Sequence, residues 1–268
     1  MSAVAERRAR FRALHAADAL FVMPNPWDAG SARLLAAAGF EALATTSAGF
    51  AWSLGRLDGA VTRDELVAHV AALATATDLP LNVDSERCYP DDPGGVAETV
   101  ALLAAAGAAG FSIEDYDPAT DRIDEVDAAA ERVRIAAEAS EAMVLTARTE
   151  NHLHGVDDLD DTIARLVAYR DAGADVVYAP GLRELDQIAA VVAAVGIPVN
   201  VLVLPGGPTV AELASVGVRR VSTGALLAGA AYGALVAGAR ELLDAGVAPS
   251  SVSVPRDLLR DAFAPPPG

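Results

Sequence analysis

The sequence alternates short apolar segments with longer alanine-rich segments along most of its length. Eight apolar segments have the length and β-branched content of buried parallel strands, and they lie at Leu20–Pro24, Ala42–Thr46, Leu81–Asp84, Gly110–Glu114, Ala142–Ala147, Val176–Ala179, Pro198–Leu202 and Arg220–Ser222. Eight segments with helical spacing follow them, at Ala29–Ala38, Arg63–Thr77, Gly95–Ala106, Val126–Ser140, Leu159–Ala172, Arg183–Ala194, Thr209–Ser215 and Ala225–Ala245. This alternation predicts an α/β protein with a (β/α)8 TIM barrel. A doubly wound open sheet is the alternative, because alternation alone does not show that the sheet closes.

Glycines support these boundaries. Each of them follows an alanine-rich helix and precedes the next strand, as glycines that end helices do; they are Gly39, Gly107, Gly173, Gly196 and Gly217. No linker-like segment interrupts the chain, so we expect one domain over residues 1–268. Within it we expect an N-terminal helix in residues 1–19, and a helical appendage followed by a loose, proline-rich tail in residues 248–268.

Composition limits the classes of partner. A net charge of −17 disfavours a nucleic-acid backbone or an anionic membrane surface as a partner. The single cysteine, Cys88, excludes an internal disulfide and predicts a reducing, cytoplasmic compartment. The segment Val221–Ala239 is uncharged over about the length that spans a bilayer. Its many small residues favour a packed helix, and we expect no membrane span.

Charged side chains follow three of the predicted strands. The segments LNVDSERCY, FSIED and VLTARTE each begin with an apolar run that is followed by charged residues, which include Asp84, Glu86, Glu114 and Arg148. The carboxyl ends of parallel barrel strands open into a shared cavity. We therefore expect these four side chains to form the functional site.

Crowded carboxylates repel one another unless a cation lies among them. Asp84, Glu86 and Glu114 offer only oxygen ligands, which favours Mg²⁺, or else Mn²⁺, over zinc. Arg148 would then bind a substrate carboxylate. The alternative is that these charges form salt bridges at the barrel rim. His152 and His154 follow on the next loop, where a histidine can act as an acid or base.

One long stretch and three short motifs carry a resemblance to a known family. The stretch PNPWDAGSARLLAAAGFEALATTSAGFAWSLGRLDG, followed by VDSE, SIED and TARTE, resembles the isocitrate lyase and phosphoenolpyruvate mutase superfamily from about Phe21 to Gly233. The resemblance implies a Mg²⁺-dependent site for a 2-oxo or 2-hydroxy carboxylate. It also implies a homo-oligomer, a dimer or tetramer in which the last barrel helix is swapped between subunits.

The resemblance assigns roles to individual residues. Ser47, Ala48 and Gly49 match a turn that holds the substrate carboxylate and its oxyanion. Asp58 matches an acid close to the metal-bound waters, and Asn200 matches a residue that contacts substrate. The remaining matches are the principal metal ligand Asp84, the second acid Glu86, the metal-water acid Glu114 and the substrate-binding Arg148. Trp27 is a further candidate for substrate contact.

The chain departs from the family pattern in one place. Lyases of the family carry a catalytic cysteine in a Lys-Lys-Cys-Gly-His type loop, and the mutase carries a Lys-Asn-x-Ser type loop there. Here the corresponding segment reads YDPATDRIDEVD. This disfavours a standard isocitrate or methylisocitrate lyase, and it also counts against the mutase and the phosphonopyruvate hydrolase.

Three hypotheses about function follow. The first is a Mg²⁺-dependent lyase or decarboxylase that breaks a carbon–carbon bond of a small 2-oxo or 2-hydroxy (di)carboxylate through an enolate. The second is a phosphonopyruvate or acylpyruvate hydrolase, or a mutase-like enzyme. The third is a protein that binds a 2-oxo acid without turning it over.

Overall fold

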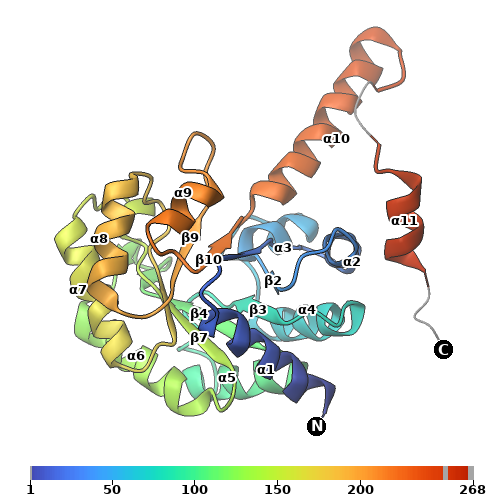
Figure 1. Cartoon of the computed structure of the whole chain (residues 1–268). Helices are drawn as coiled ribbons and strands as arrows, with labels where there is room; N and C mark the ends of the chain where they lie inside the picture. The colour runs from blue at the N-terminus through green and yellow to red at the C-terminus, as the bar shows by residue number, and fades with distance from the viewer. Residues whose placement is uncertain (1, 250–252, 265–268) are drawn as a thin grey trace.

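Eight parallel strands form a nearly closed barrel in the computed structural model, which describes residues 2–249 and 253–264 (Figure 1). The strands are β1 (Phe21–Met23), β2 (Leu43–Ala44), β3 (Leu81–Asp84), β4 (Gly110–Glu114), β7 (Val144–Arg148), β8 (Val176–Tyr178), β9 (Val199–Leu202) and β10 (Arg220–Ser222). Hydrogen-bonded neighbours follow the order β1-β10-β9-β8-β7-β4-β3-β2. The two ends of this ladder meet, because the Ala44 amide donates to the Pro24 carbonyl oxygen at 3.0 Å. The barrel prediction is confirmed, and the open-sheet alternative is wrong.

A helix follows each barrel strand on the outside of the sheet. These helices are α2 (Ala29–Ala37), α4 (Arg63–Ala76), α5 (Gly95–Ala106), α6 (Val126–Ala139), α7 (Leu159–Asp171), α8 (Leu185–Val195), α9 (Val210–Ser215) and α10 (Leu226–Ala245). Three of them begin with a capping box, in which two side chains satisfy amides of the first turn; the pairs are Asp28–Ser31, Thr62–Glu65 and Thr209–Glu212. Each segment predicted from the sequence overlaps the expected element, with ends that differ by a few residues.

Four short elements were not predicted. A short helix, α3 (Ser47–Ser53), follows β2, and a two-stranded hairpin of β5 (Tyr116–Asp117) and β6 (Arg122–Ile123) follows β4. A 3₁₀ turn, η1 (Asn151–Leu153), follows β7. The expected turn at residues 47–49 is instead the first turn of α3. Thr46 caps this helix, because its hydroxyl accepts the Gly49 amide at 3.3 Å.

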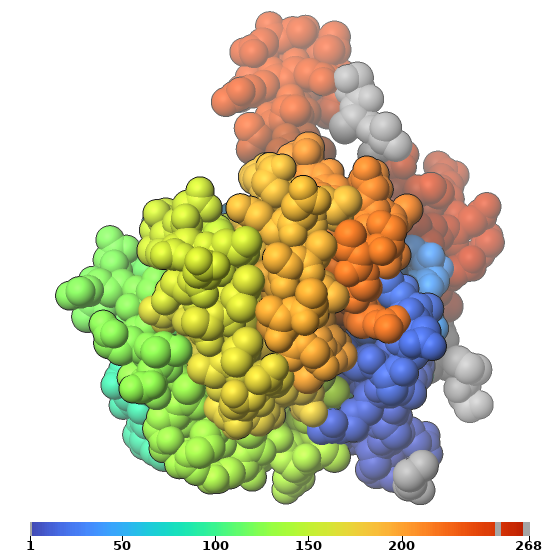
Figure 2. All heavy atoms as spheres, turned by 60° about the vertical axis from the view of Figure 1, so that its left-hand side comes forward, coloured from blue at the N-terminus to red at the C-terminus, as the bar shows by residue number. Residues whose placement is uncertain are grey.

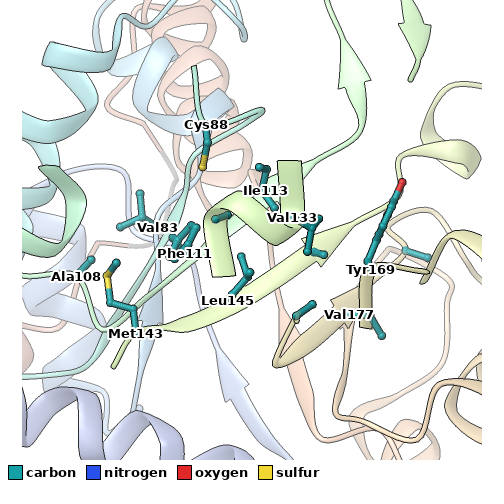
Figure 3. Packing of buried hydrophobic residues seen from close by; sticks show 14 of the residues in the cluster. Val83, Cys88, Ala108, Phe111, Ile113, Val133, Met143, Leu145, Tyr169 and Val177 are labelled. Carbon is teal, nitrogen blue, oxygen red and sulfur yellow. The ribbon is translucent and has the colours of Figure 1, made fainter. Parts of the chain in front are cut away.

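The outward faces of the strands hold the main core. Figure 3 shows Val83, Phe111, Leu145 and Val177 on four strands, packed together with residues of the surrounding helices. Side chains alternate between the two faces of a strand. The residues between these apolar ones therefore point into the barrel. This alternation places polar side chains in the barrel interior.

The N-terminal helix α1 (Ala3–Ala16) closes one end of the barrel. Phe11 is fully buried in a second apolar cluster with Phe21, Val144 and Val176, which are the first residues of their strands. Gly110 leaves room for it, since an added Cβ would lie 2.7 Å from Phe11 Cε1. Helix α1 thus closes the barrel at the beginnings of the strands, opposite to the charged strand ends.

Helix α10 extends away from the barrel body (Figures 1 and 2). Only Ala228 and Gly238 of this helix are buried, and α11 (Arg256–Phe263) folds back onto α2. Among the described residues, α10 is the one helix long and apolar enough to cross a bilayer, with a mean hydropathy of 1.3. Length and composition are weak grounds for a membrane span, and the helix swap stays a prediction. The predicted loose tail lies mainly in residues 265–268, outside the described residues.

We expect Phe11→Ala to lower the free energy of unfolding by about 3–5 kcal/mol, because it opens a cavity under the barrel. Denaturant unfolding followed by circular dichroism measures this change. Leu57→Ala is the control, since Leu57 is 81% exposed and its truncation should change stability by less than about 0.5 kcal/mol. An equal loss in both variants would contradict the role of Phe11 as a plug.

Candidate active site

Three carboxylates converge on the Arg148 guanidinium at the end of β7. Its Nη1 donates to Asp84 Oδ1 at 2.6 Å, and its Nη2 lies 3.1 Å from Glu114 Oε2. Its Nε and Nη2 lie 2.8 Å and 2.7 Å from Glu150 Oε1. The Arg148 side chain is only 14% exposed, and its guanidinium carbon lies 5.3 Å from the Tyr178 ring centroid. One buried cation is therefore shared by three acids on three different chain segments.

This cluster has more acids than bases. Burial raises the pKa of Glu114 and of Glu150, although the attraction of Arg148 opposes the rise. Burial also raises the pKa of Glu86 to about 7, and the charges of Asp84 and Asp58 add to this shift. Such raised values indicate that a further cation would be favourable here.

Asp84 connects this cluster to helix α3. Its Oδ2 accepts the Ser47 amide at 3.1 Å, and its own amide donates to Thr45 Oγ1 at 2.8 Å. The start of α3 thus faces the cluster, where its amides favour negative charge. Ala48, the next residue, lines the cavity described below.

Two adjoining cavities meet at Arg148. The inner cavity, of about 200 Å³, lies within the barrel and is lined by residues that include Asn82, Asp84, Tyr178, Asn200 and Arg220. The outer cavity, of about 290 Å³, is lined by residues that include Glu86, Glu114, Tyr116, Glu150 and His154. Both cavities share the residues Ser47, Asp58, Arg148 and Leu153. A ligand that enters from the outer cavity would meet the acid cluster before the barrel interior.

The β5–β6 hairpin covers part of the outer cavity. Tyr116 donates its hydroxyl to Asp121 Oδ1 at 2.7 Å, and its ring stacks on His154 with centroids 3.5 Å apart. Both rings line the outer cavity, as does Pro118. His152 instead contacts Thr162 Oγ1 through Nε2 at 3.1 Å and lines neither cavity. Of the two histidines singled out in the sequence, only His154 reaches the site.

Comparison with known proteins gives the family. The phosphoenolpyruvate phosphomutase family model matches residues 11–243. The chain belongs to the isocitrate lyase and phosphoenolpyruvate mutase superfamily. It is 32% identical to an oxaloacetate decarboxylase of Chromohalobacter salexigens, over 80% of this chain and 77% of that protein. The homologues are enzymes, and this chain is an enzyme of the superfamily.

Two crystal structures are similar over nearly the whole chain. One is a lyase/mutase candidate from Burkholderia cenocepacia, with 51% identity, a TM-score of 0.92 and 98% of each chain covered. The other is 2,3-dimethylmalate lyase, with 28% identity, a TM-score of 0.83 and coverage of 98% of this chain and 95% of that one. The superfamily fold is therefore present over the full barrel.

The structure brings together most of the residues that the superfamily resemblance singled out. Those that line one or both cavities are Ser47, Ala48, Asp58, Asp84, Glu86, Glu114, Arg148 and Asn200. Gly49 and Trp27 line neither cavity. An added Cβ at Gly49 would lie 2.6 Å from Thr46 Cγ2 and 3.2 Å from Trp27 Cβ. Gly49 and Trp27 therefore pack against each other behind the start of α3, and their contacts with substrate stay predictions.

The predicted metal ligands do not form a closed cage. Within residues 2–249 and 253–264, no group of three or more histidine, cysteine or acidic residues is arranged to hold a metal ion. Arg148 lies between Asp84 and Glu114, and Glu86 lines the outer cavity. A metal role for Asp84, Glu86 and Glu114 stays a prediction.

Several residues of the site were missed in the sequence. The most notable are Asn82, Ser112, Tyr116 and Arg220. The parity of the strands could have found three of them, because each stands two residues before an inward-facing site residue or strand end: Asn82 before Asp84, Ser112 before Glu114 and Arg220 before Ser222.

We predict that Glu86 makes the stability of the metal-free protein depend on pH. Its pKa is about 7 in the folded chain against an ordinary 4.5, so the folded state holds the proton more tightly. The free energy of unfolding should therefore fall as pH rises from about 4.5 through 7, by up to about 3 kcal/mol. Glu86→Gln stays neutral and should lose this share of the slope, while the share that comes from the raised pKa values of Glu114 and Glu150 remains.

Urea unfolding in EDTA between pH 4.5 and 8 measures the effect. Glu131→Gln is the control, because Glu131 is an exposed acid of α6 and its removal should leave the slope intact. Equal slopes for the wild type and Glu86→Gln would show that Glu86 keeps an ordinary pKa.

Proposed function

We propose that the chain is a Mg²⁺-dependent lyase or decarboxylase that breaks a carbon–carbon bond of a small 2-oxo or 2-hydroxy (di)carboxylate through an enolate. The observation that carries this proposal is the position of Arg148, which lies among Asp84, Glu114 and Glu150 where the two cavities meet. A buried cation at this junction can bind a carboxylate, and the surrounding acids favour a second cation beside it.

The donor set fits Mg²⁺ better than other metals. Asp84, Glu86 and Glu114 present carboxylate oxygens, and Mg²⁺ commonly binds one or two carboxylates directly and keeps several waters. Asp84 would hold the ion directly, and Glu86 and Glu114 would do so mainly through water, with Mn²⁺ as a substitute. When bound, the ion supplies Lewis-acid polarisation of the substrate carbonyl.

The protein residues bind the substrate and stabilise the charge that develops. Arg148 can donate to the C1 carboxylate of the substrate once part of the negative charge on its three neighbouring carboxylates is neutralised by a second cation. Ala48 lines the inner cavity from the first turn of α3, where its amide has no intrahelical acceptor. This amide can donate to the enolate oxygen at C2, which becomes negative as the C3–C4 bond breaks.

The outer cavity supplies groups for proton transfer. Retro-aldol cleavage of a 4-hydroxy-2-oxo acid requires a base for the C4 hydroxyl proton, and cleavage of a 2-hydroxy acid requires a base for the C2 hydroxyl proton. Decarboxylation of a 2-oxo acid releases CO₂ without such a base. All three reactions require an acid that protonates C3. Glu86 and the Tyr116–His154 pair line the cavity where this proton would be delivered.

Two alternatives stay open. A hydrolase or mutase would act on a C–P bond or on an acylpyruvate, and phosphate release from phosphonopyruvate would favour the C–P branch. A binding protein would be stabilised by a 2-oxo acid without forming product. The absence of the family's cysteine loop is the observation that favours this second alternative.

A turnover screen with Mg²⁺ tests the proposal. The substrates are oxaloacetate, 2-oxoglutarate, isocitrate, 2-methylisocitrate and phosphonopyruvate, each repeated in EDTA. We expect carbon–carbon cleavage of one of the carboxylic acids, lost in EDTA. Arg148→Met and Asp84→Asn should lower kcat at least ~100-fold, because each removes a charge that contacts the reacting group.

Asp127→Asn is the matched control, since Asp127 is an exposed acid in the first turn of α6. It should retain full activity. Metal-independent turnover, or unchanged activity in Arg148→Met, would contradict the proposed mechanism.

We also propose that α10 pairs with a second copy of the chain. Leu235, Val236, Leu242 and Leu243 of this helix are exposed, and Leu243 is 84% exposed. An exposed apolar surface of this kind usually marks an interface. The helix projects from the body, so a second copy can reach it without rearranging the barrel (Figure 1).

Light scattering after size-exclusion chromatography measures the association. We expect a dimer or a larger even-numbered oligomer for the wild type, and a shift toward monomer for the double variant Leu235→Lys, Leu243→Lys. Ala128→Lys adds one charge to an exposed position of α6 and should leave the oligomer intact. A monomeric wild type at tens of micromolar would refute the pairing.

A further inference from the structure

Arg220 spans the barrel interior beneath the inner cavity. It is the first residue of β10 and is only 1% exposed, yet it lines the cavity. Its Nε donates to Asn200 Oδ1 at 2.9 Å and its Nη2 donates to Thr146 Oγ1 at 2.9 Å. Its Nη1 lies 3.2 Å from Nε2 of His15, on helix α1. The guanidinium thus links β10, β9, β7 and α1 and forms part of the cavity floor.

All three partners of Arg220 are neutral. Asn200 and Thr146 carry no charge, and burial with the nearby Arg220 lowers the pKa of His15 to about 3, so its ring is neutral at pH 7. Among the residues that the structure describes, no carboxylate oxygen forms an ion pair with Arg220. Arg148, by contrast, has three acids around it.

An uncompensated buried charge is costly. Burial lowers the pKa of Arg220 to about 9, which still leaves the side chain charged at pH 7. Within residues 2–249 and 253–264, no opposite charge pairs with Arg220 to offset this cost. A buried cation in the wall of a substrate cavity is explained if the missing anion belongs to the ligand.

The floor also has unused hydrogen-bonding capacity. A guanidinium has five N–H donors, and three contacts of Arg220 are made to protein acceptors. Asn82 lines the same cavity, and its buried Oδ1 has no hydrogen-bond partner among the described residues. An anionic oxygen at the Arg220 donors, with a hydroxyl or a water donating to Asn82, would complete the floor.

We propose that Arg220 recognises a second carboxylate of the substrate from the floor of the inner cavity and so makes the enzyme selective for dicarboxylates. This inference rests on the proposed function, in which the reacting carboxylate is held at Arg148. The two arginines then bind the two ends of one small molecule.

Binding of two matched pairs of acids tests the proposal without requiring turnover. Malate and lactate differ by one carboxylate, and so do oxaloacetate and pyruvate. With Mg²⁺ present, the wild type should bind the dicarboxylate about 10- to 100-fold more tightly in each pair, as expected for a charge-assisted hydrogen bond. If the wild type bound both members of each pair with equal affinity, this result by itself would overturn the proposal.

Three variants locate the preference. Arg220→Met removes the charge at similar volume and should abolish the preference, while affinity for lactate and pyruvate stays unchanged. Arg220→Lys keeps the charge and should retain part of the preference. Arg219→Met is the matched control, because Arg219 is the adjacent arginine and pairs with Asp18 outside the cavity. It should behave as the wild type does.

Thermal stability separates recognition from a structural role. Removing an uncompensated buried charge should leave the melting temperature of ligand-free Arg220→Met unchanged or raised. A lower melting temperature with equal loss of affinity for monocarboxylates and dicarboxylates would overturn the proposal and assign Arg220 a structural role. Should Arg220→Met not fold, Arg220→Lys and the wild-type comparison still decide the question.

The same data distinguish this inference from the proposed function. A dicarboxylate preference that Arg220→Met abolishes, in a protein without turnover, would support Arg220 and contradict the lyase proposal. Turnover with no preference between paired acids would support the lyase and contradict the role of Arg220.

Discussion

The alternation of side chains along eight parallel strands is the constraint on which this structure depends. Every strand is covered by helices on its outer side, so residues such as Val83, Phe111 and Leu145 must be apolar. Inward-facing side chains need not be apolar beyond the end of the barrel that α1 closes. A strand can therefore read as an apolar run and still deliver Asp84 or Arg148 to the interior. Because all strands run in the same direction, their charged ends meet in one place.

The barrel interior contains two arginines in opposite electrostatic surroundings. Arg148 lies among more carboxylates than it can neutralise, whereas Arg220 is surrounded by neutral acceptors. The carboxylates around Arg148 therefore attract an additional cation, and Arg220 on the floor of the inner cavity attracts an anion. A small acid bound with a divalent ion would relieve both imbalances, which the described residues leave uncompensated. Such incomplete charge balance is costly for folding, and groups perturbed in this way cluster at functional sites.

Sequence patterns predicted the barrel because each strand and long helix has its own local signal. Strands carry apolar runs, and helices carry capping residues and terminal glycines. Helix α3 has only the Thr46 cap at its start, whereas the shorter helix α9 begins with a full capping box and was predicted. The acids and Arg148 were found because they end apolar runs. Arg220 begins an apolar run, so its inward position follows only from the alternation of side chains along the strand. The packing of Trp27 behind Gly49 follows only from the tertiary structure.

The hairpin over the outer cavity bears on which reaction the site supports best. The family's lyases place a cysteine acid at this position, and here Tyr116 and His154 stack instead, with Glu86 and Glu114 nearby. Burial raises the pKa of both carboxyls in the metal-free chain, and both line the cavity beside the tyrosine and the histidine, so the site offers proton-carrying groups other than a thiol. Cleavage of a 2-hydroxy acid additionally needs a base, and the same acids would have to be ionised for that role. Decarboxylation needs only the acid, so this arrangement favours the decarboxylase branch of the proposal.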